Sequence, residues 1–400
     1  MQFPNYTDNE RSQVHFNTTP TTAETPATSS LHSLAQAFAQ LTDQRHKRGL
    51  RYALTPLLVI LVLAKLCGAD TPSAIADWAH NRAPSLIKAL QLSWKRMPHH
   101  ATWRRILASA IDLTQFEAVA GEFLRQLTPE AAVLLNLDGK VLRGTIPGGE
   151  TQGAHLLALQ ESKSNAVVEQ TRLQPGENEI SAAKRLLPEA DLRGKIVSGD
   201  AIFAQQELSR QVVAGGGDYL WQVKDNQASL KSELADYFVQ CGARHPEVET
   251  IVQLDKGHGR LEVRQLSLSS RMADRLEWPH ISQVFKLERE AEEMRSGKKT
   301  VQVRYGITSI APADADAARI LELARGHWGI ENGLHYRRDV TLGEDKCRMK
   351  SHRAGQALAI VNNLTIGLIR HAGWENVAEA RRHYQAHMGK AWRLIVKPPG

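Results

Sequence analysis

The chain has 400 residues, of which 42% are hydrophobic, so it is long enough to form two or three domains with sizeable cores. Fifty lysines and arginines against 43 acidic residues give a formal charge of +7, which suits a polyanionic partner and equally fits an ordinary basic globular protein. Three widely separated cysteines, Cys67, Cys241 and Cys347, have no metal-binding or disulfide spacing, which argues against a disulfide-stabilised secreted domain and indicates a reducing cytoplasm.

The first residues and the most apolar segment give no sign of a membrane anchor. Residues 1–31 carry scattered threonine, serine, proline and asparagine without a signal-peptide pattern, which predicts a disordered leader. The apolar segment 55–69 is interrupted by Lys65 and is shorter than the roughly 20 apolar residues that a membrane span needs. We therefore expect a buried helix in this segment and no membrane partner.

Residues 32–128 are predicted to form an all-helical N-terminal domain. Apolar residues recur at a spacing of about 3.6 in the segments 30–41, 54–67, 72–90, 101–110 and 113–127. Two groups of basic side chains fall in this region: Arg45, His46, Lys47, Arg48 and Arg51, and Lys95, Arg96, His99, His100, Arg104 and Arg105. Such groups are more often solvated faces than binding sites, and contact with DNA is the alternative interpretation.

After Pro129 the pattern changes to strands that alternate with helices. Strands are expected at 131–138, 154–162 and 166–174, then a helix, a strand at 194–201, a second helix and a strand at 218–224. This order predicts an RNase H-like catalytic core, a mixed five-stranded sheet with helices, over residues 129–224 and 318–372. A doubly wound nucleotide-binding sheet would need early βαβ alternation and a glycine fingerprint, and neither is present.

Residues 225–317 interrupt this core. A polar helix at 227–241 precedes four segments of alternating polar and apolar residues, which predict an inserted, mainly antiparallel β subdomain. Helices then return, at 315–339 and 353–373, to complete the core. The remaining residues, 373–400, form a basic C-terminal tail that we expect to be only partly ordered.

Two of the predicted strands end in an aspartate: LLNLDG reaches Asp138 and KIVSGDA reaches Asp200. In the RNase H-like order the first and fourth strands are parallel neighbours, so their carboxylates are expected to lie side by side, where they can share a divalent metal ion. For either aspartate alone, the start of a turn is the favoured interpretation. Their pairing in this strand order favours the metal site.

A third ligand is expected from a helix that packs against the same sheet. Glu331 lies in the segment HWGIENGLHYRRD, and His327, His335 and Arg338 share its helical face, where they can touch phosphate or position a metal ligand. An exposed amphipathic face with a charge-paired glutamate is the alternative. Three other acids lie close enough in the chain to compete for the third position: Asp339, Glu344 and Asp345.

Several blocks of the sequence together carry a family resemblance: LDGKVLRG, NEISAAKRLLPEADLRGKIVSGDAIFAQ, GGDYLWQVKDNQ, HGRLEVR and HWGIENGLHYRRDVTLGED. Their ordered series resembles the ISAs-type, or H-repeat-associated, DDE transposases of bacterial insertion sequences, over roughly residues 35–370. The helical stretch ALTPLLVILVLAKLCGADTPSAIADWA is similar to the N-terminal region of that family.

The resemblance implies that Asp138, Asp200 and Glu331 are the catalytic residues and the ligands of two Mg²⁺ or Mn²⁺ ions. One departure concerns the Tyr-x-x-Arg-x-x-x-Glu signature of the wider superfamily, because Ala324 and His327 stand where that signature has tyrosine and arginine. Arg338 does occupy the later basic position of the signature.

Other residues match family positions and could grip DNA phosphates, although each alone is as often solvated surface: Lys140, Arg143, Lys224, His258, Arg260 and Arg264. Trp328, beside Glu331, could stack on a base, but an aromatic residue at such a place is more often part of a core.

The resulting expectation is a DNA transposase that binds the terminal inverted repeats of its element, cleaves them and joins them to target DNA. Its partners would be double-stranded DNA and further copies of the chain, in a homodimer or higher assembly on DNA in the nucleoid-associated cytoplasm. Two alternatives are a domesticated metal-dependent nuclease and a catalytically silent DNA-binding protein. The nuclease would need all three acids without strand transfer, whereas the silent protein would bind DNA without cutting it.

Overall fold

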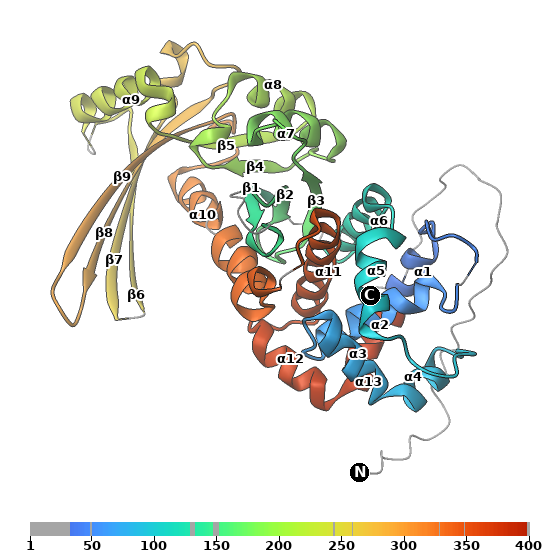
Figure 1. Cartoon of the computed structure of the whole chain (residues 1–400). Coiled ribbons are helices and arrows are strands. Elements are labelled where there is room, and N and C mark those ends of the chain that lie inside the picture. Colours follow the sequence, from blue (N-terminus) through green and yellow to red (C-terminus); the bar gives the residue numbers. More distant parts are fainter. Residues whose placement is uncertain are drawn as a thin grey trace. The chain divides into compact units, whose positions relative to one another are not determined.

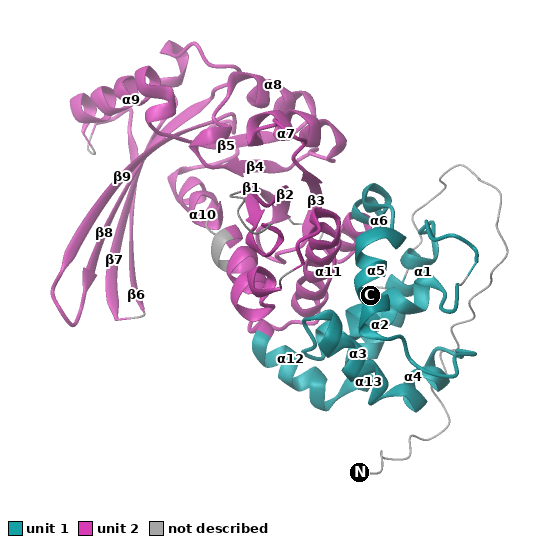
Figure 2. Ribbon diagram, viewed as in Figure 1, with its two compact units in different colours: residues 1–119, 378–400 teal, residues 120–377 magenta. Residues whose placement is uncertain are grey.

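The computed structural model describes residues 33–48, 50–128, 133–146, 152–242, 245–257, 259–327, 329–347 and 349–397, without the side chains of residues 331 and 332. The predicted leader at residues 1–31 lies outside this part of the chain. The chain divides into two compact units (Figure 2): unit 1 combines Met1–Val119 with Ala378–Gly400, and unit 2 comprises Ala120–Val377.

Unit 1 is built from helices (Figure 1): α1 Leu34–Ala39, α2 Leu54–Leu66, α3 Pro72–His80, α4 Ala83–Ala89, α5 His100–Arg105, the start of α6 Leu113–Gln126, most of α12 Val377–Ala386, and α13 Met388–Val396. Helix α2 is the predicted buried helix, because nearly all of its residues are shielded by neighbouring helices, α1, α3 and α13 among them. Within the described residues no helix is long and apolar enough to cross a membrane.

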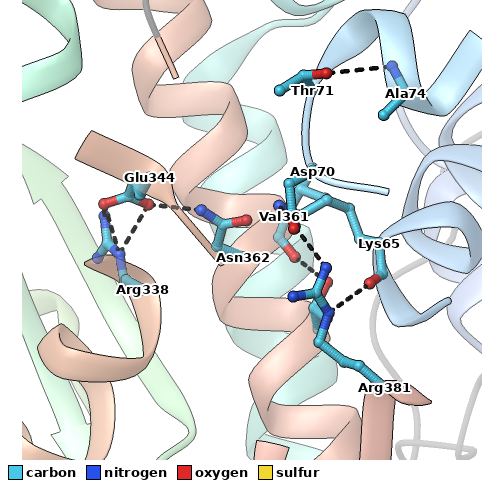
Figure 3. Close-up of polar contacts among 10 residues, drawn as sticks. Lys65, Asp70, Thr71, Ala74, Arg338, Glu344, Val361, Asn362 and Arg381 are labelled. Carbon is cyan, nitrogen blue, oxygen red and sulfur yellow. Dashed lines mark hydrogen bonds and ion pairs between the residues drawn. The ribbon is translucent and has the colours of Figure 1, made fainter. Parts of the chain in front are cut away.

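A buried ionic cluster links the C-terminal segment to α2 (Figure 3). The Lys65 ammonium is fully buried and lies 2.7 Å from a carboxylate oxygen of Asp70, and the Arg381 guanidinium lies 2.6 Å from the same oxygen. Arg381 also donates a 3.1 Å hydrogen bond to the carbonyl of Lys65. The prediction of a partly ordered tail at 373–400 therefore differs from the structure, in which α12 and α13 occupy most of this segment and Ala391 and Ile395 are buried.

Unit 2 contains a single nine-stranded mixed sheet in the order β3-β2-β1-β4-β5-β9-β8-β7-β6. The strands are β1 Leu134–Leu142, β2 Ala154–Glu161, β3 Val167–Arg172, β4 Ile196–Gly199, β5 Asp218–Val223, β6 Glu249–Gly257, β7 Arg260–Ser269, β8 Gln283–Glu293 and β9 Lys299–Thr308. Strand β1 pairs antiparallel with β2 and parallel with β4, which confirms that the first and fourth strands are parallel neighbours.

The sheet does not stop at the five predicted strands. The four strands of the insertion are antiparallel, as predicted, but β9 also pairs with β5, so the insertion extends the core sheet. This pairing covers the edge of β5, which would otherwise present unpaired backbone groups. It depends on Gly306, because a β-carbon there would lie 2.7 Å from the carbonyl oxygen of Trp221 and would overlap the ring of Phe285.

Helices cover both faces of this sheet (Figure 1). On one face, α7 Glu179–Leu186, α8 Gln206–Ala214 and α9 Ala228–Cys241 pack over a core that includes Leu137, Trp221 and Ile307. On the other, α10 Ala317–His327 packs over Leu134 and its neighbours, and α11 His352–His371 packs over Leu156. We call this second face the α10 face. Successive side chains along each strand alternate between the two faces of the sheet.

Candidate active site

Asp138 and Asp200 are neighbours across the parallel strands β1 and β4. The last register pair between these strands joins Leu137 to Gly199, and the two aspartates directly follow it. Asp200 keeps an extended backbone, with φ −71° and ψ 179°. Because parallel neighbours lie about 4.8 Å apart and side chains in register share a face, both carboxylates lie at the same place on the sheet.

The alternation of side chains assigns the two aspartates to the α10 face. Asn136, two residues before Asp138, donates a 3.1 Å hydrogen bond to the carbonyl of Gly326 in α10. Ser198, two residues before Asp200, lies 3.1 Å from Nδ1 of His327 and donates a 2.7 Å hydrogen bond to Asn136. Asn136 and Ser198 therefore connect the two strands below the aspartates to the helix that faces them.

One detail of the predicted site is wrong. Asp138 does not end its strand, because β1 continues to Leu142. It lies instead where the pairing with β4 ends, while the pairing with β2 continues as far as Leu142 opposite Ala154. On one side of Asp138 the pairing with β2 therefore continues, and on the other side Asp138 lies where the pairing with β4 ends.

Two glycines allow the sheet to pack tightly beside the aspartates. A β-carbon at Gly199 would lie 2.8 Å from the ring of Trp221, closer than side-chain contacts allow. A β-carbon at Gly139 would lie 2.9 Å from Nε2 of His155 and would overlap the carboxylate of Glu179. The DG and GD pairs in the sequence therefore reflect packing on the face opposite the carboxylates.

Each carboxylate is also fixed by a local backbone hydrogen bond. Oδ1 of Asp138 accepts a 2.8 Å bond from the amide of Gly139, and Oδ1 of Asp200 accepts a 2.9 Å bond from the amide of Ile202. The second bond caps the short helical turn Ala201–Phe203. Both side chains are thus oriented by backbone amides of their own chain segments.

The segment that carries Glu331 crosses the same end of the sheet. After α10 the chain continues in two π-helical turns, η7 Ile330–His335 and η8 Arg337–Thr341. His327 contacts Ser198 four residues before Glu331, and Nδ1 of His335 lies 3.5 Å from Oδ2 of Asp138 four residues after it. The backbone at residue 331 is therefore bracketed by contacts to β4 and to β1, whereas its side chain lies outside the described atoms.

The two histidines of this segment are neutral at neutral pH. Burial, with smaller contributions from the charges of Arg304 and Lys224, lowers the pKa of His327 to about 4. Burial, with contributions from Arg338 and Lys140, lowers the pKa of His335 to about 3. These placements make both residues uncharged supports within the protein rather than cationic contacts for phosphate.

The acids that compete with Glu331 are engaged in other contacts. Asp339 lies 2.6 Å from the ammonium of Lys140, and Asp345 accepts a hydrogen bond from the amide of Arg143. Glu344 is buried and pairs at 2.8 Å with the fully buried guanidinium of Arg338 (Figure 3). Asn362 of α11 completes this group with a 2.7 Å hydrogen bond to Glu344. Lys140 and Arg338 thus anchor the segment after Glu331.

The remaining predicted DNA contacts divide into two kinds. Arg143, Lys224 and Arg260 are exposed, whereas Arg264 is mostly buried and pairs with Asp255 and Glu262. His258 and Trp328 lie outside the described residues. The sequence analysis did not identify Asn136 and Ser198. A signal for them is present in the sequence, since each is a polar residue two positions before an aspartate in an otherwise apolar strand.

Two family models match most of the chain. The model described as Transposase DDE domain matches residues 137–368, and the one described as DDE_Tnp_1-associated matches residues 35–124. The chain belongs to the transposase DDE domain family. The first match begins one residue before Asp138 and includes Asp200 and Glu331, and the second lies within the part of the chain where we predict a helical domain.

Curated relatives agree with this family. The chain is 26% identical over 348 residues to "H repeat-associated putative transposase YhhI" of Escherichia coli (strain K12), covering 85% of this chain and 90% of the relative. The same coverage and identity are found for "Putative protein YbfL" of that strain. The chain is also 30% identical over 263 residues to "Uncharacterized protein in dhlA 3'region" of Xanthobacter autotrophicus, covering 64% of this chain and 88% of the relative.

DDE domains use divalent metal ions, and the donors at this site suit them. Asp138 and Asp200 supply hard carboxylate oxygens at one place on the sheet, which Mg²⁺ and Mn²⁺ prefer over nitrogen or sulfur. Among the side chains that the structure describes, no group of three or more histidine, cysteine, aspartate or glutamate residues is placed to hold a metal. Two of the three expected ligands thus follow the same register pair, and the side chain of Glu331, the expected third ligand, lies outside the described atoms.

Proposed function

We propose that this transposase cleaves and joins DNA at the terminal inverted repeats of its element through a metal-dependent site formed by Asp138, Asp200 and Glu331. The observation that carries the proposal is the position of the two aspartates. They directly follow the Leu137–Gly199 pair on the α10 face, where the segment containing Glu331 crosses the sheet. If each aspartate only began a turn, we would not expect the two to lie in register on the same face of the sheet.

The strand arrangement supports an RNase H-like core for this site. The order β3-β2-β1-β4-β5, with β1, β4 and β5 parallel, is the order proposed for the first five strands of that fold. In this proposal residues 129–224 and 318–372 form the catalytic core and residues 225–317 form the insertion. Residues 32–128 form a helical domain that binds DNA, and 373–400 belong to the chain's basic C-terminal segment.

The chemistry follows from the residues that would hold the metal. Divalent ions held by these residues would supply activation of a water or a 3′-hydroxyl and stabilisation of the leaving oxygen in an in-line displacement. Asp138 and Asp200 would fix the ligand oxygens on the rigid sheet, and their backbone hydrogen bonds would hold the carboxylate planes in place. Cleavage and strand transfer can share one site, because only the attacking oxygen differs.

The buried histidines have a separate role in this proposal. His327 holds the start of the π-helical segment against Ser198, and His335 lies against Asp138. Because both are neutral, they add no positive charge that would compete with a metal ion for the carboxylates. They are positioning residues, and the proposal gives them no proton to transfer.

DNA would be held by exposed basic residues around the site and in unit 1. Arg143, Lys224 and Arg260 are exposed in unit 2. In unit 1, Tyr52 and Trp94, whose rings contact edge to face at 4.8 Å, are the chain neighbours of the two basic groups at 45–51 and 95–105. An assembly of two or more copies on DNA in the nucleoid is part of the proposal, because joining two element ends requires two sites.

The test is a cleavage assay with Mg²⁺ or Mn²⁺ on labelled DNA that carries the flanks of the gene. Wild type should produce 3′-hydroxyl ends at inverted repeats, and Asp138→Asn, Asp200→Asn and Glu331→Gln should each abolish the product. Asp225→Asn is the matched control, because Asp225 is exposed and pairs only with Lys231 in its described contacts. Cleavage without strand transfer would favour the nuclease, and binding without cleavage would favour the silent DNA-binding protein.

A further inference from the structure

A second basic site lies between α10 and the inserted strands. A cavity of about 440 Å³ opens between the helix and strands β7, β8 and β9. Four arginines line it, one from each of these four elements: Arg264, Arg289, Arg304 and Arg325. Glu262 is the acidic residue among its lining side chains. We call this site the arginine pocket.

The arginine pocket and its ion pairs contain four arginines and two acids. Glu262 pairs with Arg264 and Arg289, and Asp255, just outside the lining, pairs with Arg264 and Arg325. These two carboxylates thus pair with three of the four guanidinium groups, and Arg304 donates a 3.3 Å hydrogen bond to Gln302. An excess of charge in a partly buried cavity is unfavourable unless an anion compensates it, and the planar guanidinium group is well suited to phosphate oxygens.

The strand register places the arginine pocket on the same face as the aspartates. Gly199 of β4 pairs with Trp221 of β5, so the next residues, Asp200 and Gln222, lie on the same face. Gln222 in turn pairs with Gly306 of β9. Arg304 lies two residues from Gly306 and therefore on the same face. Arg289 and Arg264 are paired with each other on β8 and β7, one and two strands farther out.

The spacing across the sheet between the two sites corresponds to a few nucleotides of a DNA strand. Strand β9 lies two strand spacings from β4, about 10 Å, and β7 lies four spacings away, about 20 Å. One strand of a DNA duplex advances about 3.4 Å per nucleotide along the helix axis, so this span corresponds to about three to six nucleotides. The exposed Lys224 follows β5 and lies between the two sites in the strand order.

The opposite face of the inserted strands has a different character. Val252, Leu254, Val301 and Val303 are exposed there, and Glu288 and Glu290 share their register rows. Lys286 and Lys299 of the same face pair with these two glutamates. The insertion therefore presents an arginine-rich face on the side of the aspartates and, on the other side, a face with exposed apolar residues whose glutamates are paired with lysines.

We propose that the arginine pocket binds a backbone phosphodiester of the DNA strand that enters the Asp138–Asp200 site, several nucleotides from the bond that is cut. This inference rests on the proposed function, since it names how that site holds its substrate. It assigns a substrate-binding role to Arg289, Arg304 and Arg325, and it places Arg264 in the same group.

The experiment measures binding of a fluorescein-labelled duplex with the flanking repeat to the full chain, in EDTA, over a series of salt concentrations. Arg304→Gln and Arg289→Gln should each weaken binding about tenfold and lower the slope of log K against log salt by about 0.9, the effect of one lost phosphate contact. Arg193→Gln is the matched control, because Arg193 is exposed, in the same unit, and precedes β4 at the end opposite Asp200.

A second variant distinguishes weaker DNA binding from loss of the folded structure. Glu262→Gln removes a negative charge from the arginine pocket and leaves all four arginines, so it should tighten binding while the thermal unfolding profile stays cooperative. A chain in which Glu262→Gln binds more weakly, or in which the arginine variants bind with wild-type affinity and salt slope, overturns the inference. If wild type cleaves the repeat but the arginine variants keep wild-type DNA affinity and salt dependence, only the role of the arginine pocket is refuted. If wild type does not bind DNA at all, the proposed function is refuted as well.

Discussion

Asp138 and Asp200 occupy equivalent positions on neighbouring parallel strands, each one residue beyond the Leu137–Gly199 pair. Sixty-one residues separate them in the chain, and these include β2, β3, α7 and β4. Their proximity depends on the parallel pairing of β1 with β4, and on the dense packing that Gly139 and Gly199 permit on the opposite face.

Gly199→Ala should destabilise unit 2 and impair cleavage. A β-carbon at this position meets Trp221 at 2.8 Å, and overpacking of this kind costs about 1 to 3 kcal/mol. The free energy of unfolding, measured with a chemical denaturant, should fall by that amount. Gly257→Ala is the control, since a β-carbon there meets nothing within 4 Å and should change stability little. Equal stability of the two variants would contradict the packing argument.

The buried His327 should make stability depend on pH. Its pKa is about 4 in the folded chain against 6.5 for the ordinary side chain, so between these values the unfolded chain binds a proton that the folded chain does not. Its contribution to stability is therefore fully present above the ordinary value and is lost as the pH falls toward 4, by about 3 kcal/mol.

The measurement for this prediction is the unfolding free energy of wild type and His327→Gln across that range. The glutamine variant keeps a polar group beside Ser198 but cannot be protonated, so the difference between the two curves isolates the histidine. A wild-type curve that runs parallel to that of the variant would show that His327 does not titrate in this way.

The buried pair of Arg338 and Glu344 should act as a unit. Removing one partner leaves an uncompensated buried charge, so Arg338→Met and Glu344→Leu should each cost about 3 to 5 kcal/mol. The double variant should recover much of this loss, which a double-mutant cycle of unfolding free energies would reveal. Asp191→Asn is a control, because its ion pair with Arg193 is solvent-exposed and should contribute little to stability. Simple additivity of the two buried changes would contradict the coupling.

Divalent metal should stabilise the folded chain through the two aspartates. A ligand that binds only the folded state at a hundred times its dissociation constant contributes about 2.7 kcal/mol, so Mg²⁺ or Mn²⁺ should raise the melting temperature of wild type and EDTA should reverse the rise. Asp138→Asn and Asp200→Asn should show a smaller rise, whereas Asp225→Asn should respond as wild type does. The same rise in all four chains would indicate metal binding elsewhere.

Much of the site could be predicted from local patterns. Apolar strands that run into Asp138 and Asp200, and the strand order around them, were sufficient to expect a carboxylate pair at one end of a parallel pair. The buried helix α2 was equally clear, because its apolar residues cover every side. These features depend on short-range sequence and on the general rules of sheet packing.

Other features depend on contacts between distant segments. The union of the core and the insertion in one sheet requires β5 to pair with β9, more than 75 residues later, with Gly306 making room for Phe285. Arg338 appears in the sequence as one of several charges at helical spacing, and only its contacts with Glu344 and Asn362 show that it is buried. The same holds for the C-terminal helices, whose basic composition conceals the apolar residues Ala391 and Ile395.

The central claim, that Asp138 and Asp200 hold the catalytic metal, is tested most directly by changing the metal preference of the site. Asp138→Cys and Asp200→Cys exchange a hard oxygen ligand for a soft sulfur ligand, while Asp138→Ser serves as a variant of similar size without a thiolate. Cleavage of the flanking repeats is then measured with Mg²⁺ and with Mn²⁺. We expect both cysteine variants to be inactive with Mg²⁺ and to regain cleavage with Mn²⁺, and the serine variant to regain less. Cysteine variants that cut equally well with Mg²⁺ would contradict the claim that these aspartates bind the metal.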